Sequence, residues 1–366
     1  MKNVVIFSNP FGNGPAGKAI SIAKYIASHS DPDKVRIFLC GSIQLETIAQ
    51  ENLRFIKIDD RNERDILETL NAIAYPKYVI SSQNRFAIKV ARANHVPCAF
   101  LDGLAWFWKE IPEEHFLADI IFWLNYPGIS ERISLSCKDK IKIVHGITEE
   151  IDTPHDLTRN SDVLMYLGGC KNPLTPLPEQ YLDLFAAVVG CIGKSGVTID
   201  ISTDVESRGY LEKYSHIFLV YTYTHSQFLS KLAQARKFIT NGGQTATLEA
   251  LNLKTSVSFF LPINLSQYAL INKVNFPGGK SYLDWKDYVE VPNNIFDYTE
   301  KDAIAFFNRQ SHSLLRNTEK CNRLCKDFLH MINKEEENKY LDNLFENLGS
   351  TGARDVYTFL HEAWGI

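Results

Sequence analysis

The chain has no run of 18 apolar residues, no Cys-x-x-Cys pair and no excess of positive charge. Without a long apolar run, there is no candidate for a membrane-spanning helix. The seven cysteines are odd in number and widely spaced, so they indicate neither a zinc ribbon nor a disulfide framework. Free thiols suit a reducing compartment, and the opening segment MKNVVIFSNPFGNG is broken too early for a signal peptide. We therefore expect a cytoplasmic protein.

The balance of charge argues against a large nucleic-acid-binding surface. The 366 residues include 39 Lys and Arg against 43 Asp and Glu, which gives a net charge of −4. Proteins that bind nucleic acid through its phosphates normally carry a basic patch. The sequence also lacks a paired-carboxylate metal motif, so we expect neither a metal nor another cofactor. It does not indicate an oligomeric state.

What the sequence does contain is a repeated alternation of short apolar runs and amphipathic stretches. The composition, 45% hydrophobic and 22% charged, is typical of a globular protein, and the length suggests two domains of roughly 150 residues. Such alternation predicts βαβ units and a mostly parallel sheet. In the first half, the expected strands cover 3–8, 35–39, 55–58, 78–81, 98–101, 120–124 and 142–144. The expected helices cover 16–28, 63–73 and 85–94.

The alternation stops at a polar segment, 147–161, and then starts again. The second set of expected strands covers 163–167, 198–201, 217–221, 237–240 and 256–260. The second set of expected helices covers 178–191, 226–235 and 245–251. We therefore predict three parts: 1–152, 153–330 and a helical tail, 331–366. The tail carries an apolar stripe that needs a docking surface, made of Val356, Phe359, Leu360 and Trp364.

The predicted fold class is α/β, with two Rossmann-like domains facing a central cleft and additional C-terminal helices. In open parallel sheets, ligands bind at the carboxyl ends of the strands. Two such domains can direct these ends into one cleft, which suits a reaction that joins two substrates. The fold alone does not fix the reaction.

The first glycine-rich loop joins the first strand to the first helix, at Asn9-Pro-Phe-Gly-Asn-Gly-Pro-Ala-Gly17. Gly12, Gly14 and Gly17 match G-x-G-x-x-G and let the backbone approach a ligand at the helix N-terminus. A dinucleotide such as NAD is disfavoured, because no acidic residue ends the second strand. The alternative is a turn that binds no ligand.

The second glycine-rich loop is followed by hydroxyl and carboxylate side chains on a helix. Gly242 and Gly243 separate a strand from this helix, and a diphosphate there could accept backbone N–H bonds. Thr245 and Thr247 add hydroxyl groups, and the carboxylate of Glu249 could accept both hydroxyls of a ribose. The alternative is an ordinary capped turn with Glu249 in solvent.

This second segment resembles the donor-binding signature of GT-B glycosyltransferases. These include plant and antibiotic UDP-sugar transferases and the bacterial N-acetylglucosaminyltransferase that makes lipid II. In the plant pattern, a ribose-binding Glu follows a glycine by six residues, within Ser-Thr-Leu-Glu-Ala-Leu. Gly243 and Glu249 have this spacing, within Ala246-Thr-Leu-Glu-Ala-Leu251.

The resemblance continues beyond this helix with one departure. The family pattern has a Pro and then Asp-Gln four and five residues later, whereas here Pro262 is followed by Ser266-Gln267. Because the family's Asp commonly contacts sugar hydroxyls, the departure at Ser266 leaves the donor sugar open. The matching segment covers roughly 217–275, and the rest of the chain matches in architecture alone.

The resemblance implies a nucleotide-sugar donor site in the second domain. Gly168 and Gly169 lie where the family has its first donor-domain loop, and 221–225 lies where it binds the base. Packing within the strand is the alternative role for the tyrosines of this loop. The implied donor-binding residues are Gly168, Gly169, Tyr223, Gly242, Gly243, Thr245, Thr247, Glu249 and Gln267.

The resemblance also implies an acceptor site in the first domain. The family often has a catalytic His in its N-terminal loop, where this chain has Asn13, which cannot act as a base. Asp102, at the end of the fifth expected strand, could replace it, or could be a turn residue instead. Fallback bases are Glu113, Glu114 and His115. The expected acceptor-binding residues are Gly12, Gly14, Trp106 and Trp108, whose indole rings can stack on a flat ring or sugar face.

The expected activity is metal-independent, inverting transfer of a sugar to a small-molecule acceptor. The expected donor is a nucleotide-diphosphate sugar, with UDP as the expected nucleotide. A nucleobase or nucleoside acceptor would need no strong base, and LGGCKNP, LDGLAW and the missing His together are similar to cytosylglucuronate-type synthases. Four alternatives stay open. They are a nucleotide-sugar epimerase or hydrolase of the same fold, a DNA-base glycosyltransferase, a retaining transferase and a non-catalytic sugar-nucleotide-binding protein.

Overall fold

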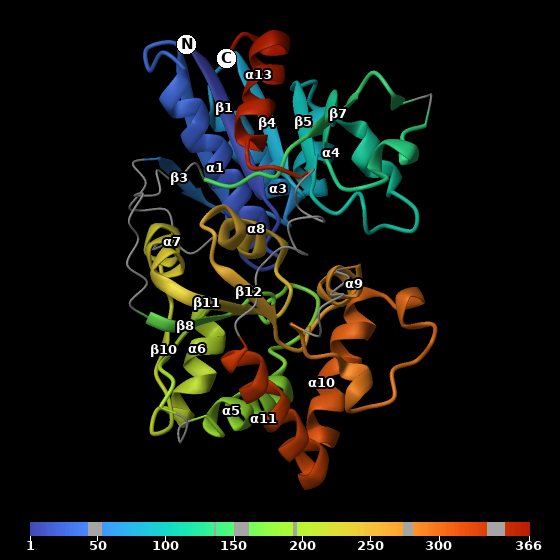
Figure 1. Cartoon of the computed structure of the whole chain (residues 1–366). Helices are drawn as coiled ribbons and strands as arrows, with labels where there is room; N and C mark the ends of the chain where they lie inside the picture. Colours follow the sequence, from blue (N-terminus) through green and yellow to red (C-terminus); the bar gives the residue numbers. More distant parts are fainter. Residues whose placement is uncertain (43–52, 135–136, 150–160, 193–195, 274–280, 335–347) are drawn as a thin grey trace. The chain divides into compact units, whose positions relative to one another are not determined.

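The computed structural model describes residues 1–42, 53–134, 137–149, 161–192, 196–273, 281–334 and 348–366. The chain divides into two compact units. The first unit comprises Met1–Glu150 and Leu344–Ile366, and the second comprises Ile151–Asn343. In Figure 1 the first unit runs from blue to green and includes the red C-terminal helix α13. Each unit is described by itself.

The first unit contains a sheet of seven parallel strands in the order β3-β2-β1-β4-β5-β6-β7. Four consecutive residues of β1, from Val4 to Phe7, are fully buried, as expected for a parallel strand covered on both faces. Each strand predicted for this half is present, within two residues of its predicted ends. The strands are β1 (Lys2–Ser8), β2 (Val35–Gly41), β3 (Arg54–Lys57), β4 (Lys77–Ser82), β5 (Cys98–Asp102), β6 (Ile120–Leu124) and β7 (Ile141–Val144).

Two helices of the first unit, α3 and α4, begin where polar side chains cap them. The side chain of Asn62 accepts a hydrogen bond from the N–H of Arg64, and Asn84 accepts one from Ala87. The helices are α1 (Gly14–His29), α3 (Glu63–Ala72), α4 (Arg85–Ala93) and α13 (Gly352–Trp364). Short 3-10 turns follow β5 and β6, namely η1 (Glu113–Leu117) and η2 (Ile129–Arg132).

The C-terminal helix α13 finds its docking surface on the first unit. It packs against α1 and β7, which lie more than 200 residues earlier in the chain (Figure 1). Val356 and Leu360 of the predicted stripe are buried, while Phe359 and Trp364 are partly buried. The stripe therefore faces the unit, as its spacing predicts.

The second unit contains a sheet of five parallel strands in the order β10-β9-β8-β11-β12. The strands are β8 (Ser161–Leu167), β9 (Ile199–Thr203), β10 (Val220–Tyr221), β11 (Ala235–Thr240) and β12 (Ser256–Phe259). The helices are α5 (Glu179–Gly190), α6 (Val205–Leu211), α7 (His225–Gln234), α8 (Gln244–Asn252), α9 (Leu265–Lys273), α10 (Glu300–Arg316) and α11 (Thr318–Asn333). Three 3-10 turns are η4 (Glu212–Tyr214), η5 (Trp285–Asp287) and η6 (Ile295–Asp297). The two parallel sheets confirm the predicted α/β class.

One predicted strand is much shorter than expected. The pattern at 217–221 predicts five strand residues, but only Val220 and Tyr221 pair with β9. Ile217 and Leu219 are exposed. These side chains gain no burial at the edge of the sheet, so alternation alone does not extend the strand.

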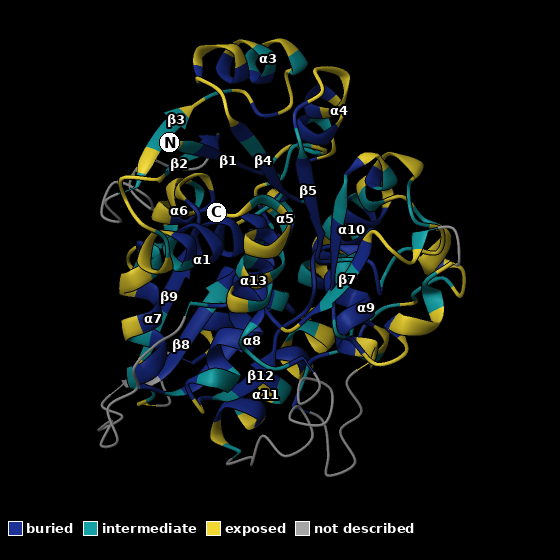
Figure 2. Ribbon diagram, turned by 90° about the horizontal axis from the view of Figure 1, so that it is seen from above, coloured by how far each residue is buried: buried dark blue, intermediate teal, exposed yellow. Residues whose placement is uncertain are grey.

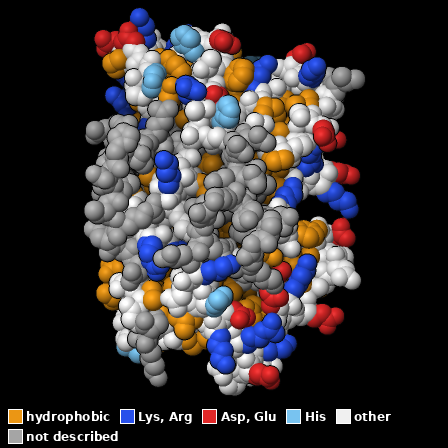
Figure 3. All heavy atoms as spheres, in the orientation of Figure 1, with side chains coloured by type: hydrophobic (Ala, Val, Ile, Leu, Met, Phe, Trp, Pro, Cys, Tyr) orange, Lys and Arg blue, Asp and Glu red, His pale blue; other side chains and the backbone are white. Residues whose placement is uncertain are grey.

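Burial and charge follow the layers of each unit. The strands are mostly buried, and exposed residues gather on the outer faces of helices and in loops (Figure 2). On the face drawn in Figure 3, Lys and Arg side chains of the described residues lie interspersed with Asp and Glu. Within the described ranges, none of the helices is both long and apolar enough to cross a membrane.

Candidate functional site

The loops that follow β8, β11 and β12 are joined at the carboxyl edge of the second sheet. The side chain of Asn241 accepts a hydrogen bond from Gly168 N at 3.2 Å and donates one to Gly168 O at 2.7 Å. Gln267 Nε2 donates to the same carbonyl at 2.8 Å, while Gln267 Oε1 accepts from Ile263 N at 3.0 Å. The fold therefore brings the loop after β8 together with two regions that lie 73 and 99 residues later in the sequence. Since both ends of the Gln267 amide are bonded to backbone, its contact with a sugar stays a prediction.

The two adjacent glycines of the second loop differ in backbone conformation and in what an added Cβ would contact. Gly242 has φ +92°, and a Cβ there would lie 3.1 Å from the carbonyl oxygen of Gln267. The backbone itself therefore requires Gly242. Gly243 has φ −67°, and the nearest atom to an added Cβ is Thr240 Oγ1, at an ordinary 3.7 Å. The fold therefore does not require glycine at Gly243.

Gly243 lies at the N-terminus of α8. It is the N-cap residue and supplies no side-chain cap, so no side chain of Gly243 satisfies the N–H groups at the positive end of the helix. Thr245 lies buried in the first turn. The Thr247 hydroxyl donates to Gly243 O at 2.7 Å, so toward a ligand this hydroxyl could only accept. The predicted contacts of Gly243, Thr245 and Thr247 with a diphosphate stay predictions.

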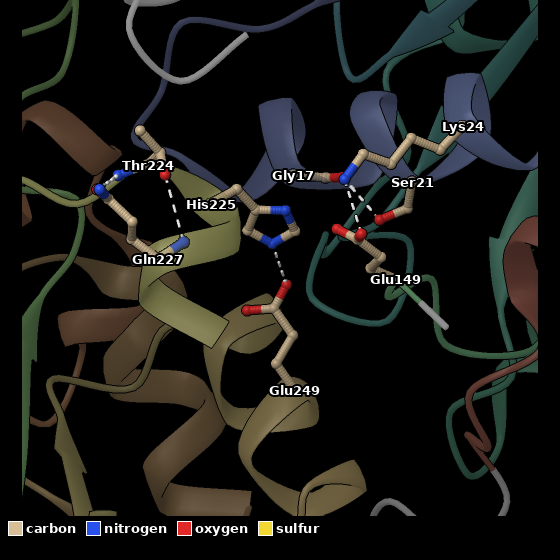
Figure 4. Close-up of polar contacts among 8 residues, drawn as sticks. All are labelled: Gly17, Ser21, Lys24, Glu149, Thr224, His225, Gln227 and Glu249. Carbon is tan, nitrogen blue, oxygen red and sulfur yellow. Dashed lines mark hydrogen bonds and ion pairs between the residues drawn. The ribbon is translucent and has the colours of Figure 1, made fainter. Parts of the chain in front are cut away.

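Glu249, also on α8, makes a side-chain contact that sequence reasoning missed. Its Oε1 lies 2.8 Å from Nε2 of His225, the first residue of α7 (Figure 4). Only 3% of the Glu249 side chain and 10% of the His225 side chain are exposed. Solvent therefore does not surround Glu249, contrary to the alternative in which it is a solvated turn residue. The sequence signal available was a histidine directly after the capping Thr224, in the loop expected to bind a base.

The tyrosines of the loop before α7 are held in different ways. The Tyr223 hydroxyl donates to Asp200 Oδ1 at 2.6 Å, and burial and this carboxylate raise the pKa of Tyr223. Its ring is stacked on that of Tyr221, with centroids 5.5 Å apart and planes 11° apart. Tyr221 is 41% exposed, so its ring is the accessible one of the two. The ring of Tyr223 is stacked against it.

In the first unit, Asp102 is the centre of a buried hydrogen-bond network. Its Oδ1 accepts from Leu104 N at 2.9 Å and from Trp108 Nε1 at 3.2 Å. Its Oδ2 lies 2.9 Å from Nδ1 of His115. Asp102 is only 1% exposed, so an acceptor cannot readily reach it. The fold joins Asp102, Trp108 and His115, which makes His115 the group that Asp102 orients.

The other residues predicted for the acceptor site lie in two places. Trp106 is buried and packs against Tyr126, with ring centroids 5.1 Å apart. Its indole is therefore part of the core rather than an exposed stacking face. Gly12, with φ +64°, Asn13 and Gly14 lie in the turn between β1 and α1, where Asn13 is exposed at the N-cap.

A buried carboxyl group that sequence reasoning missed lies at the same edge of the first sheet. Asp60 is fully buried, Ser42 Oγ donates to its Oδ1 at 3.3 Å, and burial raises the pKa of Asp60 to about 6. The side chain of Asn84 donates to the backbone oxygen atoms of Asp60, at 2.8 Å, and of Ser8, at 3.3 Å. The only sequence signal was its position in a polar segment after a strand.

Within the described part of the chain, there is no group of three or more His, Cys, Asp or Glu residues that could hold a metal ion. All seven cysteines are free thiols. The candidate functional residues therefore lie in each unit at the carboxyl edge of its own sheet.

Comparison with known proteins identifies the fold and no sequence family. No protein-family model matches the chain, and no curated protein matches its sequence. Among solved structures, the chain resembles the UDP-GlcNAc 2-epimerase of Methanocaldococcus jannaschii in complex with UDP-GlcNAc and UDP. The TM-score is 0.60 at 14% identity, over 99% of this chain and 100% of the other.

Two further solved structures show a similar likeness. S. aureus MnaA with UDP has a TM-score of 0.55 at 13% identity, over 99% of this chain and 96% of that one. A UGT transferase of Siraitia grosvenorii in complex with UDP has a TM-score of 0.51 at 11% identity, over 99% of both chains. The chain therefore has the GT-B fold, which UDP-sugar glycosyltransferases and UDP-GlcNAc 2-epimerases share. The predicted fold is confirmed, at identities that show fold alone.

Proposed function

We propose that this chain is a glycosyltransferase that uses a UDP-sugar donor and a small-molecule acceptor. The observation that carries the proposal is the N-terminus of α8. There, the backbone does not require glycine at Gly243, and Glu249 follows on the same helix. At 1.5 Å per residue, Glu249 lies about 9 Å along the helix axis from Gly243. A diphosphate at the helix N-terminus and a ribose near Glu249 would fit this order.

In this proposal the second unit holds the donor. Backbone N–H groups and the positive end of α8 would stabilise the negative charge that develops on the leaving diphosphate. The exposed ring of Tyr221 would stack on the base. These groups supply the electrostatic stabilisation that a metal ion supplies in other transferases, so we propose metal-independent transfer.

The first unit would supply the base. Asp102 bonds Nδ1 of His115, so Nε2 is the ring nitrogen that can take up a proton. The acceptor oxygen or nitrogen would attack the anomeric carbon while the bond from that carbon to the diphosphate breaks. The acceptor proton would pass to His115 Nε2, and one direct displacement gives inversion. Asp102 is then a positioning residue, and Asn13 would bind the acceptor through its amide.

A nucleobase or nucleoside acceptor agrees with this arrangement. A ring nitrogen loses its proton more easily than a sugar hydroxyl, so it needs only a weak base. For such an acceptor, His115 would need to be no more than a weak base. Incubation with the matching donor and either nucleosides or alcohol acceptors would distinguish these acceptor classes, with product mass as the readout.

The test of the donor site is a thermal-unfolding panel with UDP, GDP, dTDP, CMP and NAD. A ligand at 100 times its Kd stabilises the folded protein by about 2.7 kcal/mol. We expect stabilisation by UDP and its loss in Glu249→Gln, a variant that keeps the shape of the side chain. If none of the nucleotides stabilises the protein, the donor site is refuted and a non-catalytic role becomes the better explanation.

A second candidate function is epimerisation or hydrolysis of the nucleotide sugar. The likeness to the M. jannaschii epimerase at a TM-score of 0.60 extends over the whole of that chain, so the fold suits both reactions. An epimerase or hydrolase changes its UDP-sugar with no acceptor present. Nuclear magnetic resonance spectra of UDP-GlcNAc incubated with the protein alone would show this, whereas a transferase leaves the donor nearly intact until an acceptor is added.

A further inference from the structure

The contact between His225 and Glu249 joins two helices at the proposed donor site. Glu249 lies on α8 and His225 begins α7, and the two helices pack against each other. The Nε2–Oε1 distance is 2.8 Å, and both side chains are nine-tenths buried or more. A buried carboxylate oxygen needs a hydrogen-bond donor because it has lost contact with water. The Nε2–H group of His225 supplies this donor.

The N-terminal turn of α7 fixes the position of the histidine. Thr224 caps the helix through a complete capping box, in which Gln227 N donates to Thr224 Oγ1 at 3.2 Å. In return, Thr224 N donates to Gln227 Oε1 at 3.1 Å (Figure 4). A capping box restricts the backbone of the residues it encloses, and His225 is one of them. The capping box therefore fixes the backbone from which the imidazole projects.

The contact leaves one oxygen of the carboxylate available. Oε1 of Glu249 is bonded to His225, and no group of the described residues is bonded to Oε2. A carboxylate has acceptor sites on both oxygens, so fixing Oε1 sets the direction in which Oε2 accepts. If a nucleotide lies along α8, a ribose hydroxyl is the donor that this oxygen could meet.

We propose that His225 is a positioning residue that orients Glu249 for the hydroxyls of a ribonucleotide. This inference rests on the proposed donor site and deepens it, because it assigns ribose recognition to a pair of residues on two helices. It follows that the protein discriminates against nucleotides that lack ribose hydroxyls, and that the discrimination depends on His225.

The test compares UDP with 2′,3′-dideoxyuridine diphosphate, which keeps the base and the diphosphate and lacks both hydroxyls. Calorimetric Kd values would be measured for the wild type, His225→Phe and His225→Gln. Phenylalanine keeps the ring and removes the donor, whereas glutamine keeps an N–H donor near the position of Nε2. Thermal unfolding without ligand reports whether each variant is folded.

For the wild type we expect UDP to bind at least about tenfold more tightly than the dideoxy analogue, which corresponds to 1.4 kcal/mol. His225→Phe should weaken UDP binding by about tenfold and change binding of the analogue by less than about twofold, because only the hydroxyl contact is lost. His225→Gln should keep most of the preference for UDP. If His225 had a purely structural role, His225→Phe would weaken the binding of UDP and of the analogue by the same factor.

Three results would overturn the inference. The first is equal weakening of both nucleotides by His225→Phe, which leaves the preference for UDP unchanged, and the second is binding of both nucleotides by that variant as tight as by the wild type. The third is a wild type that binds UDP and the analogue equally well. In all three cases UDP binding still supports the donor site. A wild type that binds no nucleotide would instead overturn the proposed function and this inference together.

Discussion

Replacing Gly243 with alanine should weaken UDP binding while leaving the fold intact, whereas the same change at Gly242 should weaken the fold. The two glycines are adjacent, equal in size and part of one loop. They differ in backbone conformation and in what an added methyl group would meet. The pair therefore separates the needs of the fold from the needs of a ligand.

The expected magnitudes follow from the local geometry. At Gly242, φ of +92° is a conformation that costs an alanine about 1–2 kcal/mol. The added Cβ would also approach Gln267 O at 3.1 Å and the Ile271 side chain at 3.2 Å, so we expect a loss of about 2–3 kcal/mol in unfolding free energy. At Gly243, alanine reduces the entropy of the unfolded chain but is a poorer N-cap, two effects of similar size. We expect a net change within about 1 kcal/mol.

The assay combines urea unfolding of the free protein with calorimetric titration of UDP. For Gly243→Ala we expect near-normal stability and a UDP Kd raised by at least about tenfold, or 1.4 kcal/mol, because the methyl group fills the space before α8. For Gly242→Ala we expect a lowered unfolding free energy as the main effect. An unchanged Kd for Gly243→Ala would refute the placement of the diphosphate at the N-terminus of α8.

Two further predictions concern the buried carboxyl groups of the first unit. Because burial raises the pKa of Asp60 from 3.8 to about 6, the folded state binds a proton that the unfolded state releases, so stability falls as pH rises through this window. Asparagine does not titrate, so the unfolding free energy of Asp60→Asn minus that of the wild type should increase by about 2–3 kcal/mol between about pH 4 and pH 7. If urea titrations show the same difference at each pH, this prediction is wrong. Asp102→Ala removes the acceptor of three hydrogen bonds and should lower the unfolding free energy by about 3–5 kcal/mol. Asp102→Asn keeps an acceptor oxygen and should lower it clearly less in the same titrations. Equal losses in the two variants would mean that the hydrogen bonds of Asp102 do not stabilise this loop.

Local sequence pattern was sufficient for most of the fold. A run of consecutive apolar residues, such as that from Val4 to Phe7, predicts a parallel strand, because such strands are covered on both faces. The structure buries all four of these residues. The glycine-rich turn before α8 was visible for a similar reason, since a positive φ at Gly242 leaves few other residues possible. The pattern failed at 217–221, where an edge position gave Ile217 and Leu219 no burial, and pattern carries no information on whether a strand has a neighbour.

The sequence by itself determined the α/β class, the strands and the position of the loop before α8, because each depends on residues close together in the chain. Only the tertiary structure decided which side chains meet. His225 contacts Glu249 across 24 positions, and Asp102 contacts His115 across 13. It also decided that the Trp106 indole packs in the core and that Tyr221, rather than Tyr223, is exposed. The reason is geometric, because parallel strands bring their carboxyl ends to one edge only after the helices between them have packed, and no local pattern records that distance.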